Sequence, residues 1–399
     1  MTTLQTISQL ANQCVLCGIC IPHCPTYHIF KSENESPRGR IALFKALAEN
    51  EITTSQALLS SLDHCLGCRA CERICPSQVN YAQLSHLGRA LIASELQSLK
   101  QPLSKKLVET LLPSPQLQPW LKLASKSLQP FVISNHKKTK GNSQKNSNKV
   151  TSKNKQKNVL LFHDCTSELF EYGIIDDIKQ LINACGINII SPKKHSCCGA
   201  ISLRKGDMNR ARTQINDNIK QLVNLDDKDL SIVAINNVCS AQLSDYQQFS
   251  DIPNAEKFAD KIMDAIHFLV VLLKEHPLQF SPMQESIGVG VHISCSLKNA
   301  LKEELLLFEL LENIPNIKLD KINDRFCCGA AGSYRLQYPE IANQLLDIKL
   351  DDIKAKQHKL IVSSNFGCSM HFNKGLQQQN IQKVEVLHPI SLLARQLIF

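Results

Sequence analysis

Two cysteine motifs near the start of the chain constrain its fold more than any other feature. They run over residues 14–25 and 65–76, and both fit the spacing C-x2-C-x2-C-x3-C-P at every required position. Three cysteines two residues apart let one loop wrap around a cubane, whereas the fourth leaves on another path and binds the other cluster. The spacing predicts two [4Fe–4S] clusters, cluster 1 on Cys14, Cys17, Cys20 and Cys75 and cluster 2 on Cys24, Cys65, Cys68 and Cys71.

A pair of zinc ribbons is the alternative that these motifs must be weighed against. Zinc needs four ligands, commonly two C-x2-C pairs from separate hairpins. Each run here adds a third cysteine in phase and a Cys-Pro ending, which zinc does not require. The chain holds 17 cysteines, and its first residues lack the basic start and apolar run of a secretion signal. We therefore expect reduced, metal-binding thiols in a cytoplasmic protein rather than disulfides.

The second half of the chain contains an internal repeat, visible in its cysteines. Each copy has a lone cysteine, then Cys-Cys-Gly after 31 intervening residues, then a last cysteine. Corresponding cysteines are 130 residues apart, or 129 for the last ones. The residues are Cys165, Cys197, Cys198 and Cys239 in the first copy and Cys295, Cys327, Cys328 and Cys368 in the second.

Both copies alternate apolar runs with helical patterns. Apolar runs at 159–162 and 287–291 precede the first cysteines, helical patterns follow at 168–184 and 299–312, and further apolar runs at 230–235 and 359–362 precede the last cysteines. Alternating strands and helices indicate a parallel sheet covered by helices, with sites at the carboxyl ends of the strands. The expected fold is α+β / α/β: a helical two-cluster ferredoxin-type region followed by two pseudo-symmetric α/β repeats.

These patterns divide the chain into four segments. We predict a ferredoxin-type domain at 1–100, a connector at 101–158, a first Cys-Cys-Gly repeat at 159–278 and a second at 279–399. The connector carries eight lysines and no acidic residue over 136–158, which leaves about +1 of the net charge of +9 for the rest. Such a tract is typical of a disordered linker, with attachment to an anionic membrane or an acidic partner as the alternative. No aromatic residue interrupts it, so nucleic-acid binding is not expected.

The repeat cysteines allow three uses. Four thiolates can hold a further iron–sulfur cluster, the adjacent pair can be a redox dithiol, or the site can be structural. Asn236 and Asn365 stand where a C-x2-C ending would begin, which favours one simple cluster or none. Cys185 fits no motif and is expected to be a small buried residue. Histidines near the motifs are expected to be hydrogen-bonding neighbours rather than ligands: His163, His195, His292, His23, His28 and His64.

Nucleotide and flavin motifs are missing from the chain. Its one G-x-G, at Gly288 and Gly290, continues to Ile293 where a dinucleotide fingerprint needs glycine. The longest apolar stretch, near 265–273, is far shorter than the roughly 20 residues of a membrane-spanning helix. We therefore expect no FAD or NAD on this chain, no catalytic residue, and electron transfer on behalf of a partner.

The whole arrangement resembles the iron–sulfur subunit of bacterial glycolate oxidase. The motifs that carry the resemblance are Cys24-Pro-Thr-Tyr27, Ser36-Pro-Arg-Gly-Arg-Ile41, Asp63-His-Cys-Leu-Gly-Cys-Arg69, Leu87-Gly-Arg89, Cys327-Cys-Gly-Ala-Ala-Gly332 and Asn365-Phe-Gly-Cys368. The resemblance implies flavin-binding partner subunits that oxidise glycolate to glyoxylate. It also implies electron delivery to a quinone, with the chain peripheral on the inner face of the cytoplasmic membrane.

One local departure and several alternatives accompany this resemblance. Val238-Cys239-Ser240 replaces the Gly-Cys-Gly expected in the first repeat, which weakens the case for a cluster there. Similar subunits serve lactate utilisation, anaerobic glycerol-3-phosphate dehydrogenase and heterodisulfide reductases. A redox-sensing module without an enzymatic partner is the non-enzymatic alternative.

Overall fold

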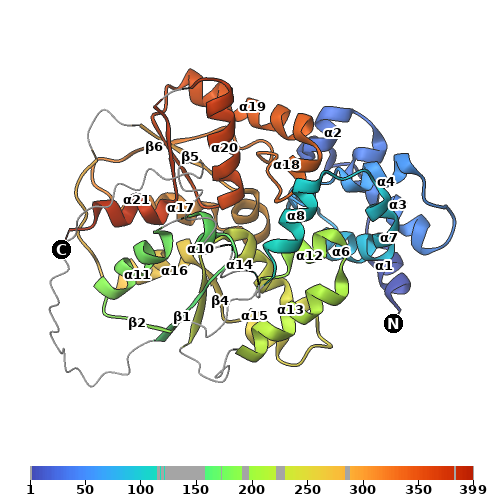
Figure 1. The fold of residues 1–399 in the computed structure, drawn as a ribbon, viewed down its shortest axis with the longest axis horizontal. Helices are drawn as coiled ribbons and strands as arrows, with labels where there is room; N and C mark the ends of the chain where they lie inside the picture. The colour runs from blue at the N-terminus through green and yellow to red at the C-terminus, as the bar shows by residue number, and fades with distance from the viewer. Residues whose placement is uncertain are drawn as a thin grey trace.

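The structure is a computed structural model that describes residues 2–114, 117, 121, 158–171, 173–190, 197–221, 230–283, 288–381 and 383–398. A helical N-terminal region leads into two α/β units, each built on a parallel four-stranded sheet (Figure 1). The predicted fold class is confirmed. His195 and the lysine-rich tract, apart from Asn158, lie outside the described residues.

The N-terminal region is a set of short helices around one apolar core. Thr2 and Gln5 cap the first helix reciprocally, and the core contains Ile7, Phe44 and Leu84. The elements are α1 (Thr3–Asn12), η1 (Ile21–His23), α2 (Pro25–Phe30), η2 (Glu33–Glu35), α3 (Pro37–Ala48), α4 (Gln56–Asp63), α5 (Ala70–Ile74), α6 (Tyr81–Leu91), α7 (Ala93–Ser98) and α8 (Leu103–Leu111).

Helix α8 was not expected from the sequence, because it lies in the segment 101–158 that was predicted to be a connector. Its buried Glu109 accepts a hydrogen bond of 2.6 Å from Ser333 Oγ in the second repeat. The chain therefore contacts the second repeat before it begins the first.

The first repeat has the strand order β2-β1-β3-β4, all parallel. Its elements are β1 (Asn158–Phe162), α10 (Ser167–Phe170), α11 (Ile174–Ala184), β2 (Asn188–Ile190), α12 (Ala200–Lys205), α13 (Met208–Gln221), β3 (Ser231–Ala234), α14 (Asn237–Ser244), η4 (Asp245–Gln248), α15 (Ala255–Ala259), β4 (Ile262–Asp264) and α16 (Ala265–Glu275). Strands β1 and β3 are buried nearly throughout, as expected for the centre of a sheet covered on both faces.

The second repeat reproduces this order as β6-β5-β7-β8. Its elements are β5 (Gly288–His292), the π-helix η5 (Ser296–Leu301), α17 (Glu304–Leu311), β6 (Lys318–Lys321), α18 (Tyr334–Gln337), α19 (Pro339–Ala355), β7 (Leu360–Ser363), α20 (Phe366–Gln378), β8 (Glu385–Leu387) and α21 (Pro389–Gln396). The expected single helices over 168–184 and 299–312 are each interrupted, by Gly173 in the left-handed region and by Lys302, respectively.

The two repeats share one core between their sheets. Helix α11 of the first repeat packs on α21 of the second, and α16 of the first packs on α17 of the second (Figure 1). Since α11 corresponds to α17 and α16 to α21, the two contacts are equivalent. Apolar side chains of both sheets, including Leu161 and Val291, belong to the same buried cluster. This reciprocity is the pseudo-twofold symmetry that the cysteine spacing predicted. Among the described residues, every helix is too short or too polar to cross a bilayer.

Candidate iron–sulfur and thiol centres

A small cavity lies beneath the first cysteine loop. It has a volume of about 30 Å³, and its walls include the four cysteines predicted for cluster 1, together with Cys71. Cys75 reaches this cavity from the end of α5, 55 or more residues away in sequence from the other three. Burial raises the pKa of the Cys20 thiol to about 11, so deprotonation there needs a compensating positive charge.

A second cavity of about 20 Å³ lies beneath the second cysteine loop. Its walls include the four cysteines predicted for cluster 2, with Cys24 contributed by the first motif. Burial opposes deprotonation of Cys65, but the Arg40 and Arg89 guanidinium groups outweigh it and lower the pKa of that thiol. Burial instead raises the pKa of Cys68 and Cys71, so Cys65 is the thiol of this cavity whose pKa the arginines lower. Four cysteines around one small cavity still supply the donor set of a cubane cluster.

The start of α3 lines both cavities, and its local structure explains the Ser-Pro-Arg-Gly-Arg motif. Ser36 Oγ accepts the Gly39 N–H at 2.9 Å and caps the helix, and Pro37 occupies the first turn, where its missing N–H is harmless. Arg38 donates to Leu16 O at 2.8 Å within the first cysteine loop. A Cβ on Gly39 would lie 2.0 Å from Glu33 O, so this turn tolerates only glycine.

Arg40, the last residue of that motif, is a buried cation beside Cys24. Only 1% of it is exposed, and its Nη2 pairs with the buried Glu35 carboxylate at 2.5 Å. Its Nη1 donates to Thr26 Oγ1 at 3.0 Å and lies 4.0 Å from Cys24 Sγ. This arrangement brings a fixed positive charge to the second cavity, where cluster 2 is expected.

The thiols of the second repeat lie in a row. Cys327 Sγ is 3.8 Å from Cys295 Sγ, and Cys328 Sγ is 3.1 Å from Cys368 Sγ. Contacts from the Cys295 and Cys328 thiols and from the Gly329 N–H lower the pKa of Cys327 despite burial. The contact with Cys327, together with burial, raises the pKa of Cys295 and Cys328, and Cys368 raises that of Cys328 further. The site thus favours one thiolate supported by neighbouring thiols.

The first repeat has the same arrangement. Cys197 contacts Cys165 and Cys198, and these thiols together with the Gly199 N–H lower the pKa of Cys197. Cys239 contacts Cys198, in the position that Cys368 has in the second repeat. The structure therefore brings all four cysteines of each repeat together.

The glycine of Cys-Cys-Gly has a backbone role in both copies. Gly199 and Gly329 have φ values of +91° and +87°, which favour glycine. This conformation aims their N–H groups at Cys197 and Cys327. At Gly329 a Cβ would also lie 2.5 Å from Ala342 O.

The two asparagines that replace a cysteine have a function that sequence reasoning missed. Asn236 caps α14 by accepting from the Val238 N–H at 3.1 Å, and Asn365 caps α20 by accepting from the Cys368 N–H at 3.1 Å. Asn365 Nδ2 also donates to Asn236 Oδ1 at 3.2 Å, across the pseudo-twofold axis. The sequence did contain a signal for this role, because asparagine occurs at the same position of both repeats.

The predicted neighbouring histidines have various environments. His292 Nδ1 is 2.9 Å from Ser363 Oγ, and its ring lies beside Cys328 and Cys368. His64 Nδ1 is 2.7 Å from Glu35, and His28 packs against Phe326. Three further residues complete the set: His163 and Cys185 are buried, and His23 ends η1.

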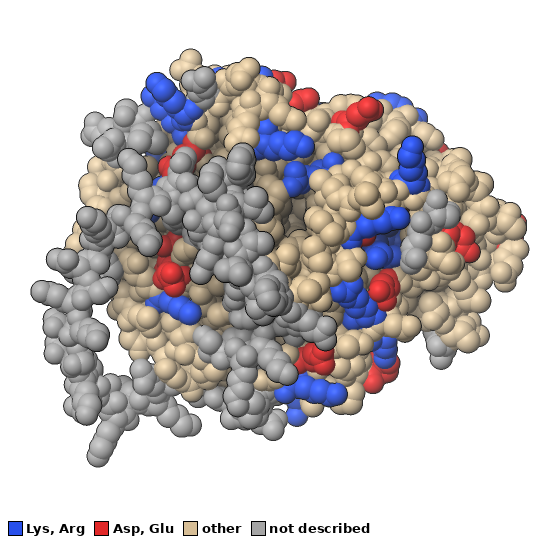
Figure 2. All heavy atoms as spheres, in the orientation of Figure 1, with Lys and Arg blue, Asp and Glu red and all other residues tan. Residues whose placement is uncertain are grey.

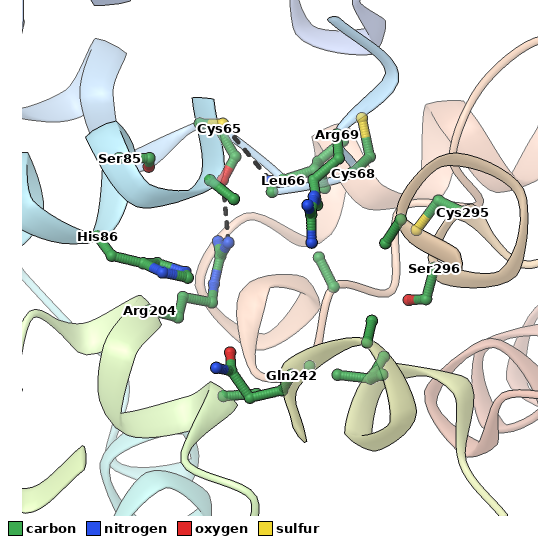
Figure 3. A pocket seen from close by; sticks show the side chains of 18 of the residues that line it. Cys65, Leu66, Cys68, Arg69, Ser85, His86, Arg204, Gln242, Cys295 and Ser296 are labelled. Atoms are coloured by element: carbon green, nitrogen blue, oxygen red, sulfur yellow. Dashed lines mark hydrogen bonds between the residues drawn. The ribbon is translucent and has the colours of Figure 1, made fainter. Parts of the chain in front are cut away.

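A larger cavity of about 200 Å³ lies where the N-terminal region meets both repeats (Figure 3). Cys65, Cys68 and Cys295 line it, and Arg204 reaches across it from the first repeat to donate to Cys65 O at 3.0 Å. Asn299 of the second repeat donates to Cys68 O at 2.8 Å. The second cysteine loop and the thiols of the second repeat are therefore direct neighbours.

On the face shown in Figure 2, basic and acidic side chains of the described residues are interspersed. This agrees with the placement of most of the net charge in the lysine-rich tract.

Comparisons with known proteins agree with this architecture. A family model described as a 4Fe-4S dicluster domain matches residues 10–79, and one described as a cysteine-rich domain matches 159–244 and 289–373. The chain is similar to the glycolate oxidase iron-sulfur subunit of Escherichia coli, with 28% identity over 91% of this chain and 89% of the relative. It is 28% identical to the probable glycolate oxidase iron-sulfur subunit of Bacillus subtilis over 98% of each chain.

A third relative, lactate utilization protein A of Shouchella clausii, is 27% identical over 59% of this chain and 98% of its own length. The resemblance that the motifs indicated is confirmed. The iron–sulfur and repeat character of the chain is confirmed with it.

Proposed function

We propose that this chain, which is similar to iron–sulfur proteins of the glycolate oxidase and lactate utilization type, carries electrons from a flavin-binding dehydrogenase subunit toward a quinone. The oxidised substrate is a 2-hydroxy acid, glycolate in the first instance, and its oxidation takes place on the partner. The chain itself binds no flavin or nicotinamide cofactor and works at the inner face of the cytoplasmic membrane.

One observation carries the proposal: each of the two cysteine-lined cavities has three cysteines of one motif and the last cysteine of the other motif in its walls. Cys75 joins the three cysteines of the first loop, and Cys24 joins those of the second. These two sets of four are the proposed ligands of two [4Fe–4S] clusters, which supply one-electron carriers when bound. The Arg40 and Arg89 guanidinium groups lower the pKa of Cys65, which supports an ionised thiolate at that one ligand.

The repeat thiols are a proposed third metal-binding region. Four cysteines per repeat are close enough to share metal, Cys165, Cys197, Cys198 and Cys239 in the first and Cys295, Cys327, Cys328 and Cys368 in the second. The second repeat is favoured as an electron exit, because its Asn299 binds the backbone of the second cysteine loop.

The test is a mixing experiment under anaerobic conditions. The purified chain, flavin-binding dehydrogenase subunits of the same organism and glycolate are combined, and bleaching of the visible cluster absorption is followed. We expect no bleaching without the flavin subunits, and bleaching within the turnover time when they are present. Robust glycolate oxidation by the chain alone, or clusters that remain oxidised in the complete mixture, would contradict the proposal. Replacing glycolate with lactate identifies the preferred acid.

A further inference from the structure

The second repeat contains a group of donors that the four-cysteine pattern does not include. His292, Cys328 and Cys368 place their ligand atoms within 4.8 Å of one another, and all three residues are buried, with exposures of 2%, 2% and 5%. They come from three places in the fold: the end of β5, the loop after β6 and the first turn of α20. Within the described residues, this is the one group of three or more His, Cys, Asp or Glu residues whose ligand atoms all lie within 4.8 Å of one another.

The spacing of these atoms suits one ion better than a cubane. Ligands of a tetrahedral zinc ion, at about 2.3 Å for sulfur and about 2.0 Å for nitrogen, are about 3.5–3.8 Å apart. Cys328 Sγ and Cys368 Sγ are 3.1 Å apart, somewhat closer than that, and all ligand atoms of the group lie within 4.8 Å of one another. The thiolates of a cubane each bind a different iron and stand farther apart, around a cavity like those beneath the two N-terminal loops.

The surroundings of His292 orient its ring as a ligand. Ser363 Oγ, on the neighbouring strand β7, lies 2.9 Å from Nδ1, and Phe372 packs edge-on with ring centroids 4.8 Å apart. With Nδ1 held by Ser363, Nε2 is the ring atom free for a metal. Histidines that bind a metal through one ring nitrogen typically form a hydrogen bond through the other, as His292 does with Ser363.

We propose that His292, Cys328 and Cys368 bind a single divalent ion of the imidazole–thiolate class, Zn²⁺ foremost. The site leaves one tetrahedral position for a further ligand. It goes beyond the electron-transfer proposal and leaves the eight N-terminal cysteines of that proposal untouched. In the second repeat it takes the place of a four-cysteine cluster, and Zn²⁺ carries no electrons. It also assigns His292 a role as ligand, where the sequence predicted a hydrogen-bonding neighbour.

The test uses the full-length protein, with clusters reconstituted anaerobically and Zn²⁺ supplied. Zinc content and zinc K-edge absorption report the site without interference from iron. We expect one tightly held zinc per chain, with two sulfur neighbours and at least one nitrogen neighbour. His292→Ala should remove the nitrogen neighbour and weaken zinc binding by at least tenfold in a chelator competition. His388→Gln, at another buried histidine of the same repeat, is the matched control and should change neither.

Two further variants keep the test decisive if His292→Ala folds poorly. Ser363→Ala leaves all three donors in place and should weaken zinc by about 10–100-fold through loss of ring orientation. Cys295→Ser should leave zinc unchanged, because Cys295 is outside the group. The proposal is overturned if Cys295→Ser and Cys328→Ser release iron equally while His292→Ala retains the metal, which is the behaviour of a four-cysteine cluster. Absence of iron from the N-terminal cysteine loops of the reconstituted, unmutated protein would instead contradict the electron-transfer proposal and leave the zinc proposal standing.

Discussion

Arg40 gives the sharpest test of how the protein stabilises its second cluster cavity. We consider Arg40→Met, which keeps an unbranched but shorter side chain and removes the guanidinium with its charge. Arg40 and Glu35 pair at 2.5 Å with side-chain exposures of 1% and 6%. Removing one partner of a buried pair costs about 3–5 kcal/mol, because the other charge remains buried. His64 still contacts Glu35 at 2.7 Å, so we expect the lower end, about 3 kcal/mol.

Arg38 is the natural control, since it lies two residues away on the same helix. Its pair with Glu33 is exposed, at 32% and 50%, and surface pairs contribute little. Arg38→Met should therefore shift stability far less than Arg40→Met. The assay is the guanidinium midpoint at which the visible cluster absorption is lost, measured anaerobically alongside helical circular dichroism.

A second mutation separates the electrostatic explanation from simple loss of packing. If the cost of Arg40→Met comes from an uncompensated Glu35 charge, adding Glu35→Gln should recover part of the lost stability. Equal midpoints for the two arginine variants, or a Glu35→Gln change that deepens the loss, would refute the reasoning.

The remaining predictions concern the repeats and the connector. Gly329→Ala should cost about 1–3 kcal/mol in thermal unfolding, because its φ is +87° and a Cβ would clash with backbone, whereas Gly332→Ala has open space around it and should cost less. Burial and the nearby Asp164 raise the pKa of Glu171 to about 8. Because the folded protein holds this proton more tightly than the unfolded chain, Glu171 lowers the free energy of unfolding as pH rises from about 4.5 to 8. Glu171→Gln should therefore stabilise the protein at pH 8 and have little effect at pH 4.5. Shortening the lysine-rich tract modestly should leave iron content and the unfolding midpoint unchanged, and unfolding of either half would show that the tract is structural.

Much of the architecture could be predicted from the sequence because it is encoded in local spacing. The repeated cysteine intervals predicted two α/β units, and the apolar runs at 159–162 and 359–362 fall on β1 and β7. Such patterns need only the period of a strand or the reach of one loop. The interruption of the helical pattern at Lys302 was less visible, because a left-handed residue that is not glycine leaves little mark on sequence.

Features that depend on distant contacts could not be predicted. Arg204 binds Cys65 O across 139 residues, and His292 meets Cys328 and Cys368 only once three separate segments have folded. Asn365 resembled a lost cysteine, although the structure gives it a helix cap and a bond across the pseudo-twofold axis. In each case the role belongs to the packing of several elements rather than to any one segment.

The assignment of ligands to two clusters is the centre of this account, and paramagnetic resonance of single variants tests it most directly. Each Cys→Ser change should alter the spectrum of the cluster that the cysteine binds, in protein that begins with about eight iron per chain. We predict that Cys75→Ser perturbs the same signal as Cys17→Ser, and that Cys24→Ser perturbs the same signal as Cys68→Ser. If Cys75→Ser instead affects the Cys68 signal, or if the protein holds stoichiometric zinc and negligible iron in these loops, the account is wrong.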